Sequence, residues 1–153
     1  MKTIKQELQE LKLPIAYVDI RFSVHATEDP EKVEKAVFNL LPANCIEEAA
    51  FKKDALKGHY GNPIILFETR VKDEQMIKAF VEKLATRLGE LDKETISRES
   101  NLFVEKSNLY LRFDKQAAFE DKFQLRKADP IYIRIHFRKR SVIEICREIG
   151  LMS

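Results

Sequence analysis

Residues 108–118 read Asn-Leu-Tyr-Leu-Arg-Phe-Asp-Lys-Gln-Ala-Ala, and this stretch guides the interpretation of the whole chain. Apolar residues alternate here with polar ones, as in a β-strand that buries one side and exposes the other. The buried side would carry Leu109, Leu111 and Phe113, and the exposed side Tyr110, Arg112 and Asp114. The stretch predicts a sheet with one apolar face and one chemically active face, provided that other strands extend both.

Other parts of the chain show the same alternation. We expect strands at residues 15–26, 64–71, 122–126 and 131–138, and the last has the clearest period of two. Residues 46–56 fit either an exposed edge strand or a helix, and we interpret them as a strand. The polar sides of the predicted strands together carry Asp19, Arg21, Ser23, His25, Glu68, Arg70, Tyr110, Arg112, Gln124, Arg126, Tyr132, Arg134, His136 and Arg138.

Apolar residues at helical spacing separate these strands. Residues 27–30, Thr-Glu-Asp-Pro, offer cap residues and a first-turn proline for a helix that ends before Pro42. A second helix is predicted over residues 73–89, with Phe80 on its apolar stripe, and a short one over residues 93–99.

The two ends of the chain add two further predicted helices. Residues 1–12 form an amphipathic pattern, and Ser141 can cap a final helix. The chain is thus expected to be a single domain, residues 1–153, with residues 1–12 appended to a core of residues 15–149. The predicted fold is a two-layer α+β fold, an antiparallel sheet with helices packed on one face and the other face at least partly open.

The formal net charge of the 153 residues is +2, which by itself does not indicate nucleic-acid binding. The charge is uneven, however, because residues 1–100 carry a net charge of −2 and residues 101–153 a net charge of +4. The basic C-terminal third is rich in arginine, whose planar guanidinium suits both phosphate binding and stacking on bases.

The cysteines and the hydropathy pattern indicate where in the cell the protein is expected. Cys45 and Cys146 are distant in sequence, with no CxxC pattern, and they are expected to be buried thiols. No leader pattern and no apolar run near the roughly 18 residues of a membrane span is evident, so we expect a cytoplasmic protein without a membrane partner.

The polar face suggests a binding partner. Exposed bases of single-stranded RNA stack on aromatic and guanidinium groups while cations hold the backbone, so this face predicts RNA binding. The candidate RNA-binding residues are Arg21, His59, Tyr60, Arg70, Tyr110, Arg112, Lys115, Arg126, Tyr132, Arg134 and Arg138. Composition leaves open the alternative of a solvated face on which cross-strand acid–base pairs merely shield the sheet.

Residues 58–61, Gly-His-Tyr-Gly, match the spacing of the GxxG loop that clamps nucleotides in KH domains. A KH loop joins two helices, whereas this one lies between predicted strands. A hairpin turn is therefore the favoured interpretation, with His59 and Tyr60 at its tip within reach of a nucleotide.

Catalytic and metal motifs are not evident. The three histidines are scattered and show no HExxH or HxH spacing, so we predict no metal and no cofactor. An acid–base pair of Asp114 with His59 would make a metal-independent nuclease, but the sequence gives no reason for them to converge. Asp114 is interpreted first as a residue that starts a turn, and the protein as a non-enzyme.

Four blocks of sequence resemble a known family. They are residues 24–29 (Val-His-Ala-Thr-Glu-Asp), 58–63 (Gly-His-Tyr-Gly-Asn-Pro), 109–116 (Leu-Tyr-Leu-Arg-Phe-Asp-Lys-Gln) and 129–131 (Asp-Pro-Ile). In this order they resemble the archaeal predicted RNA-binding proteins described as exosome-associated subunits. The fold of those proteins is similar to that of the ribosomal protein that holds the small ribosomal RNA in the large subunit.

The resemblance implies a cytoplasmic archaeal protein without catalysis, which binds RNA and acts near RNA processing or ribosome metabolism. Its implied partners are RNA and exosome or ribosome-associated proteins. The alternative from the residues is a protein-interaction module, such as a homodimer, that docks through the helix of residues 1–12 or through an edge strand.

Overall fold

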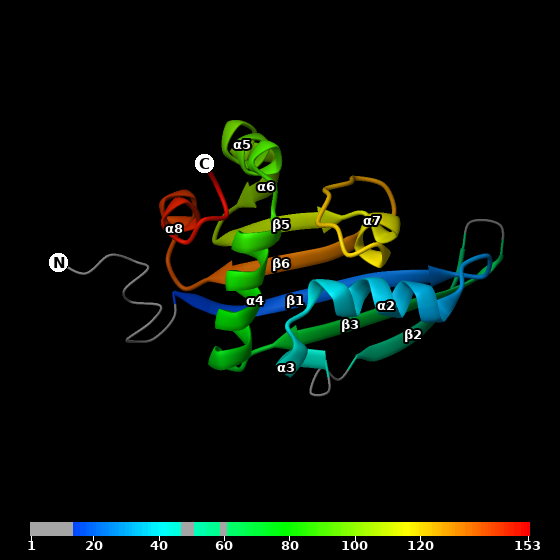
Figure 1. Cartoon of the computed structure of the whole chain (residues 1–153). Helices are drawn as coiled ribbons and strands as arrows, with labels where there is room; N and C mark the ends of the chain where they lie inside the picture. The colour runs from blue at the N-terminus through cyan, green and yellow to red at the C-terminus, as the bar shows by residue number, and fades with distance from the viewer. Residues whose placement is uncertain (1–13, 47–50, 59–60) are drawn as a thin grey trace.

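The computed structural model describes residues 14–46, 51–58 and 61–153 of the chain (Figure 1). Its strands are β1 (Ile15–His25), β2 (Lys52–Lys57), β3 (Pro63–Val71), β4 (Val104–Glu105), β5 (Asn108–Phe113) and β6 (Ile131–Phe137). Its helices are α2 (Pro30–Leu40), α3 (Ala43–Ile46), α4 (Glu74–Arg87), α5 (Glu90–Arg98), α6 (Ser100–Phe103), α7 (Lys115–Phe119) and α8 (Val142–Glu148). The predicted helix over residues 1–12 lies outside the described residues.

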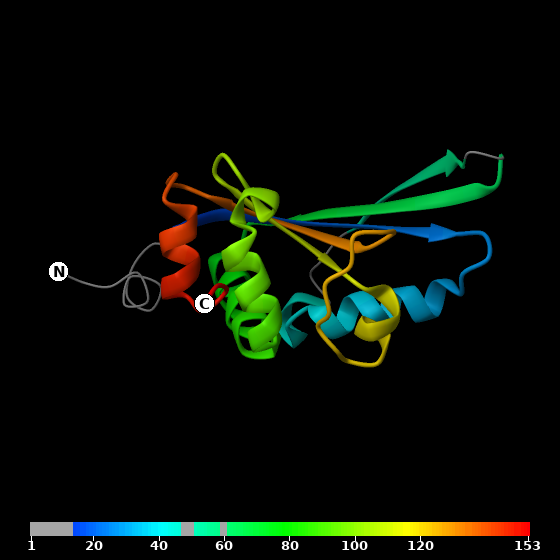
Figure 2. The same cartoon turned by 90° about the horizontal axis from the view of Figure 1, so that it is seen from above.

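The strands form one six-stranded sheet in the order β2-β3-β1-β6-β5-β4. Neighbouring strands of this sheet pair antiparallel, and in Figure 2 helices α2, α4, α5 and α7 lie on one side of it. Among the described residues, no helix covers the opposite side. The predicted two-layer α+β fold with one open sheet face is therefore confirmed.

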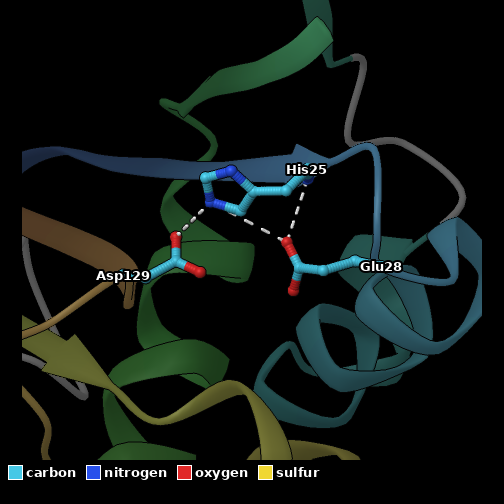
Figure 3. Close-up of side chains that lie close together, drawn as sticks. All are labelled: His25, Glu28 and Asp129. Carbon is cyan, nitrogen blue, oxygen red and sulfur yellow. Dashed lines mark hydrogen bonds and ion pairs between the residues drawn. The ribbon is translucent and has the colours of Figure 1, made fainter. Parts of the chain in front are cut away.

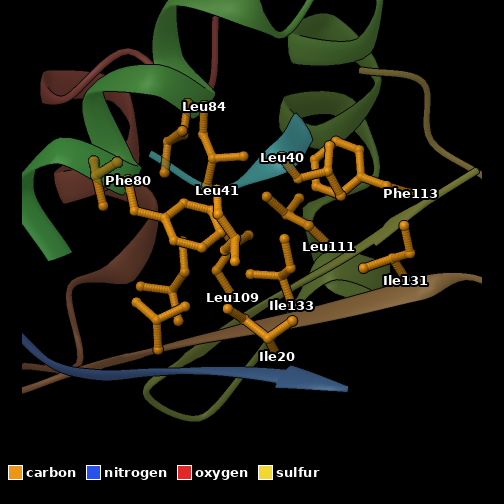
Figure 4. Packing of buried hydrophobic residues seen from close by; sticks show 14 of the residues in the cluster. Ile20, Leu40, Leu41, Phe80, Leu84, Leu109, Leu111, Phe113, Ile131 and Ile133 are labelled. Carbon is orange, nitrogen blue, oxygen red and sulfur yellow. The ribbon is translucent and has the colours of Figure 1, made fainter. Parts of the chain in front are cut away.

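The register explains why one face is apolar. Ile133 of β6 pairs with Ile20 of β1 on one side and with Leu111 of β5 on the other, so all three point the same way. Phe80 of α4 and Leu40 of α2 belong to the same buried cluster, which Figure 4 shows from close by. Each of these side chains is at most 1% exposed, and burying one of them contributes about 1.5–3 kcal/mol.

Aspartates begin three of the helices. Asp29 accepts a hydrogen bond from the backbone N–H of Glu31, and Asp73 accepts one from that of Met76. Asp114 accepts one from the backbone N–H of Ala117. A side-chain cap of this kind stabilises a helix by about 1 kcal/mol. Asp114 is thus a cap, and β5 ends at Phe113, so residues 108–118 are a strand followed by a short helix.

The structure corrects two further predictions about strands. Residues 122–126 form no strand, because only Leu125 makes an isolated bridge, to Phe113 at the end of β5. In the first strand, a β-bulge between Ile15 and Tyr17 changes the alternation. Regular alternation with Val18 and Ile20 would bury Ala16, but Ile15 is buried instead, and Tyr17 pairs with His136 on the polar side.

Two regions between the main elements differ in length from their predictions. The predicted strand over residues 46–56 begins only at Lys52. It is an edge strand, because β2 stands at one end of the strand order and pairs with β3. The predicted short helix over residues 93–99 is longer, and α6 and β4 follow it unpredicted.

The turn at residues 58–63 is a hairpin that joins β2 to β3. The backbone N–H of Gly58 donates to Asn62 O at 2.7 Å, and Gly61 has a φ of 80°, which favours glycine. This arrangement confirms the hairpin interpretation over a KH loop between helices. His59 and Tyr60 lie outside the described residues.

The predicted burial of the two cysteines is confirmed. Cys45 and Cys146 are both 0% exposed, and burial raises the pKa of the Cys146 thiol to about 12. Both side chains therefore belong to the apolar core. In the part of the chain that the structure describes, no helix combines the length and the apolar character that crossing a bilayer requires.

Candidate functional site

The open face of the sheet gathers arginine and tyrosine side chains from β1, β3, β5 and β6. Because the strands are antiparallel and in register, the polar residues of each strand lie beside those of the next. We name this surface the arginine–tyrosine face, and it comprises Tyr17, Asp19, Arg21, Glu68, Arg70, Tyr110, Arg112, Tyr132, Arg134 and His136.

Tyr132 lies at the centre of one row of this face. The guanidinium of Arg21 is 4.8 Å from the centre of its ring, and that of Arg112 is 5.2 Å away. The ring of Tyr110 is next to it, with 5.9 Å between ring centres. Burial, and to a lesser extent Tyr110, raise the pKa of the Tyr132 hydroxyl, so the ring is neutral at physiological pH. Cation–π contacts hold it as an ordered stacking surface.

Asp19 lies at the centre of the next row. It accepts hydrogen bonds from Arg70, at 2.7 Å to Nε and 3.1 Å to Nη2, and from Arg134 Nη2 at 2.6 Å. Burial alone would raise the pKa of this carboxyl, but the bonds from the two arginines outweigh it and the pKa lies below its usual value of 3.8. One carboxylate thus fixes two guanidiniums, and the group retains positive charge.

Tyr17 and His136 close the face beyond Asp19. The guanidinium of Arg70 is 3.8 Å from the centre of the Tyr17 ring, and the His136 ring stacks on Tyr17 at 4.7 Å. Tyr17 alternates in step with Asp19 and Arg21 and reaches this side by the regular pairing of β1 with β6, although the sequence interpretation did not name it.

Acidic partners on the face are fewer than its arginines. Besides the pairs of Asp19, Arg21 is 4.0 Å from Glu68, and both side chains are about half exposed, so this pair is weak. Within the described residues, no carboxylate pairs with Arg112. Cross-strand acid–base pairs, which the alternative of a merely solvated face requires, are thus present. They do not balance the arginines, so the face keeps a net positive charge.

The arginine–tyrosine face also contains a shallow depression. An open depression of about 510 Å³ is lined by side chains of β1, β2, β3 and β6. Its charged residues are Asp19, Arg21, Lys52, Glu68, Arg70 and Arg134. Such a depression offers an anionic backbone several cationic donors at once.

The remaining candidate residues lie elsewhere. Arg126 pairs with Asp114 at 3.1 Å and is 61% exposed, in the loop beside the end of β5. Arg138 is exposed and comes directly after the end of β6. The pairing of β6 with β5 ends two residues earlier, at His136 and Asn108. Lys115 is not on the face, because its ammonium group points into a separate cluster.

This Lys115 cluster comprises Ser23, His25, Glu28, Lys115 and Asp129. The Lys115 ammonium is 3.1 Å from Glu28 Oε1, 3.0 Å from Asp129 Oδ2 and 2.7 Å from Ser23 O, and its side chain is only 11% exposed. Burial would raise the pKa of the Asp129 carboxyl, but hydrogen bonds from His25 and Lys115 hold it below the usual value. The cluster joins the end of β1 to α7 and to the loop before β6.

Three side chains of this cluster have the chemistry of metal ligands (Figure 3). His25 Nε2 is 3.0 Å from Asp129 Oδ1 and 3.9 Å from Glu28 Oε1. The Lys115 ammonium, however, already contacts both carboxylates and offsets one of their two negative charges. A metal ion would have to displace this ammonium, so the donor set fits a structural ion-pair network better than a metal site.

Asp129 occupies an unusual backbone conformation in this cluster. Its φ is 45°, in the left-handed region, and Pro130 follows it. The contacts with His25, Lys115 and Ser23 offset this strain. Residue spacing did not predict the cluster, although three of the four blocks that carry the family resemblance contain its members.

Comparisons with known proteins identify a family and its members. A family model described as RNA binding matches residues 17–137. An RNA-binding protein of Pyrococcus abyssi is 31% identical over 145 residues, which cover 90% of this chain and 94% of that protein.

Solved structures give the same fold. A protein of Archaeoglobus fulgidus from the family named DUF54 has a TM-score of 0.72 at 34% identity, and the match covers 88% of this chain and 99% of that one. A DUF54 protein of Methanothermobacter thermautotrophicus also has a TM-score of 0.72, at 30% identity over 89% of this chain and 98% of that one.

Proposed function

The chain belongs to the family described as RNA binding, and from this premise we propose that it is a non-catalytic protein that holds single-stranded RNA on its arginine–tyrosine face. The observation that carries the proposal is the row of Arg21, Tyr132 and Arg112 on an open sheet, in which two guanidiniums flank one ring. The name of the Pyrococcus abyssi relative supports the same function.

The chemistry of the face favours an unpaired strand. Base stacking on a tyrosine ring requires a free base face, which a duplex hides inside its own stack. The arginines can bind phosphates in a bidentate manner while the bases lie on Tyr132 and Tyr110. Asp19 binds the guanidiniums of Arg70 and Arg134 and offsets part of their charge, and as a carboxylate it offers RNA phosphates no favourable contact.

The test is binding of a labelled single-stranded RNA over a range of salt concentrations. Each phosphate contact contributes about 0.7 to the slope of log affinity against log salt for single strands. The double variant Arg112→Ala with Arg134→Ala should bind more weakly, and its slope should be smaller by about 1.4. A matched control removes two exposed arginines from helices α5 and α8, Arg98→Ala with Arg147→Ala, and should bind like the wild type.

Two results would contradict the proposal. One is the absence of any binding to single-stranded or structured RNA at low salt. The other is equal loss of affinity in the face variant and in the control, since only a diffuse charge effect would then be at work.

A second candidate function is a protein-interaction module, favoured by the open edge of β2. Leu56 on this strand is 50% exposed, and the outer side of the strand has no described neighbour in the sheet. Lys52, Lys53 and Lys57 on the same strand oppose pairing with a second copy. The mass in solution, with and without residues 1–12, separates the two functions. A monomer in both cases, with RNA binding retained, argues against dimerisation.

We propose further that the RNA-bound protein acts in RNA processing, in contact with exosome or ribosome-associated proteins. The support is the resemblance of residues 24–29, 58–63, 109–116 and 129–131 to that family. Co-purification from an archaeal extract before and after ribonuclease treatment tests it. Partners that survive the treatment indicate protein contact, and partners lost by it indicate that RNA is the only bridge.

A further inference from the structure

A second hollow lies beside the arginine–tyrosine face, at the end of β5. It has a volume of about 300 Å³ and lies between helices α5 and α6 on one side and residues 125–127 on the other. The volume is at the lower end of the roughly 300–1,000 Å³ typical of small-molecule sites. Arg112 lines this hollow and also contacts the Tyr132 ring, so this one side chain belongs to both the hollow and the face.

One part of its lining is apolar. Leu102, Phe103 and Leu125 contribute to it, and Leu102 is 55% exposed. Phe103 and Leu125 pack on their other sides against the core, so their positions are fixed. An aromatic and two leucines suit the flat faces of a heterocyclic ring.

The rim of the hollow is cationic. Arg112, Arg126 and Lys127 line it, which gives three cations from β5 and from the loop between α7 and β6. Arg126 is held by Asp114, but its guanidinium has further donors, and the side chain is 61% exposed. A phosphate next to a ring inside the hollow would meet these groups.

The wall formed by α5 is acidic. Asp92 and Thr95 share one side of α5, and Glu99, the residue that caps its C-terminal end, lines the same wall. Within the described residues, neither carboxylate has a hydrogen-bond or ion-pair partner. Burial raises the pKa of the Asp92 carboxyl, as expected for a partly enclosed acid. Thr95 already donates its hydroxyl proton to Leu91 O.

We propose that this hollow binds one unpaired guanine of the RNA strand held on the arginine–tyrosine face, an inference that rests on the proposed function. Ionised carboxylates only accept hydrogen bonds, so they select the base edge richest in donors. The Watson–Crick edge of guanine offers the N1–H and N2–H groups side by side. Uracil offers a single N–H between two carbonyl oxygens, which a carboxylate repels.

A paired base cannot enter this hollow, because its Watson–Crick edge is already engaged in the duplex. The hollow therefore adds a preference for unpaired guanine to a face that otherwise binds RNA without regard to sequence. Asp92 and Glu99 would be the residues that determine this preference, and Arg112 would link the guanine to the rest of the strand.

The experiment compares labelled single-stranded octamers: eight uridines, and the same octamer with one central guanosine, inosine, adenosine or cytidine. The wild type should bind the guanosine octamer about tenfold more tightly than the uridine octamer. Inosine, which lacks the N2 amine, should fall between them. The double variant Asp92→Asn with Glu99→Gln should bring all the octamers within about twofold of one another, because each amide replaces an acceptor oxygen with a donor.

A matched control neutralises two exposed acids of the same helix, Glu90→Gln with Glu94→Gln, and should keep the guanosine preference. Thermal unfolding of each variant establishes that the fold is intact. Equal binding of all octamers by the wild type, or a guanosine preference that survives in the Asp92 and Glu99 variant, overturns the guanine site and leaves the proposed function standing. Absence of binding to every octamer overturns both.

Discussion

Asp19 and Lys115 are centres of two charge clusters with opposite compositions. Asp19 is one carboxylate between two guanidiniums, on the open face of the sheet. Lys115 is one ammonium between two carboxylates, with a side chain only 11% exposed. The first cluster presents surplus positive charge to the solution, while the second uses its charges within the fold. We propose that similar ion-pair chemistry serves RNA binding around Asp19, whereas around Lys115 it connects distant parts of the chain.

The largest expected effect comes from breaking the Lys115 cluster. The nearly isosteric change Lys115→Met leaves the carboxylates of Glu28 and Asp129 without their shared cation. We expect the free energy of unfolding to fall by on the order of 3 kcal/mol, as for other enclosed ion pairs that lose one partner. Urea denaturation measures it. Lys122→Met, at a lysine 63% exposed, is the control and should change stability little.

The comparison also predicts what Lys115→Met leaves intact. Because the Lys115 cluster does not belong to the arginine–tyrosine face, the folded variant should bind single-stranded RNA like the wild type. A loss of RNA affinity without a loss of stability would contradict the structural role assigned to Lys115.

The next effect concerns the stacking surface. Tyr132→Leu removes a ring that lies within cation–π distance of both Arg21 and Arg112. Stacking of one base on an aromatic side chain contributes about 1–3 kcal/mol, so affinity for single-stranded RNA should fall about tenfold. The salt slope should not change, because no phosphate contact is lost. Tyr132→Phe keeps the ring and should retain most of the affinity; an equal loss in both variants would argue against stacking.

The smallest effect is expected at Asp19, on the arginine–tyrosine face. Asp19→Asn weakens the hold on Arg70 and Arg134, and we expect it to lower the free energy of unfolding by about 1 kcal/mol at neutral pH. It also removes a negative charge that repels phosphate, so RNA affinity should rise. Lower RNA affinity with unchanged stability would show that Asp19 contacts the ligand in some other way.

The Asp19 effect should also depend on pH. In the folded protein the pKa of Asp19 lies below its usual value of 3.8, so its contribution to stability is complete above that pH and is lost as the pH falls through the folded pKa. The stability difference between wild type and Asp19→Asn should therefore disappear in strongly acidic solution. Urea denaturation at pH 7 and at successively lower pH measures this difference.

Local sequence patterns were sufficient for the main strands and helices. The period of two in residues 131–138 corresponds to β6, whose inward residues are all buried, and Asp29 and Asp73 begin the two main helices. These features depend on neighbours within a few positions. Residues 122–126 showed the same alternation, but their only partner is the end of β5, so a single bridge forms and no strand.

The features that could not be predicted from the sequence depend on contacts between residues far apart in the chain. Lys115 and Glu28 are 87 positions apart, and no periodicity connects them. The bulge that puts Ile15 into the core is a property of the pairing of β1 with β6. The hollow beside β5 likewise needs α5 and residues 125–127 to converge. The polar face was predictable in composition, whereas its internal pairs required the sheet register.

The most direct test of the central claim is a nuclear magnetic resonance titration with a single-stranded uridine octamer. It follows the arginine Nε–H and tyrosine ring signals, which report on side chains one by one. Binding on the arginine–tyrosine face predicts shifts for Arg21, Arg112 and Tyr132, with little change for Arg147 on α8. Shifts confined to the helical side or to the Lys115 cluster, with the Tyr132 ring unaffected, would contradict the account.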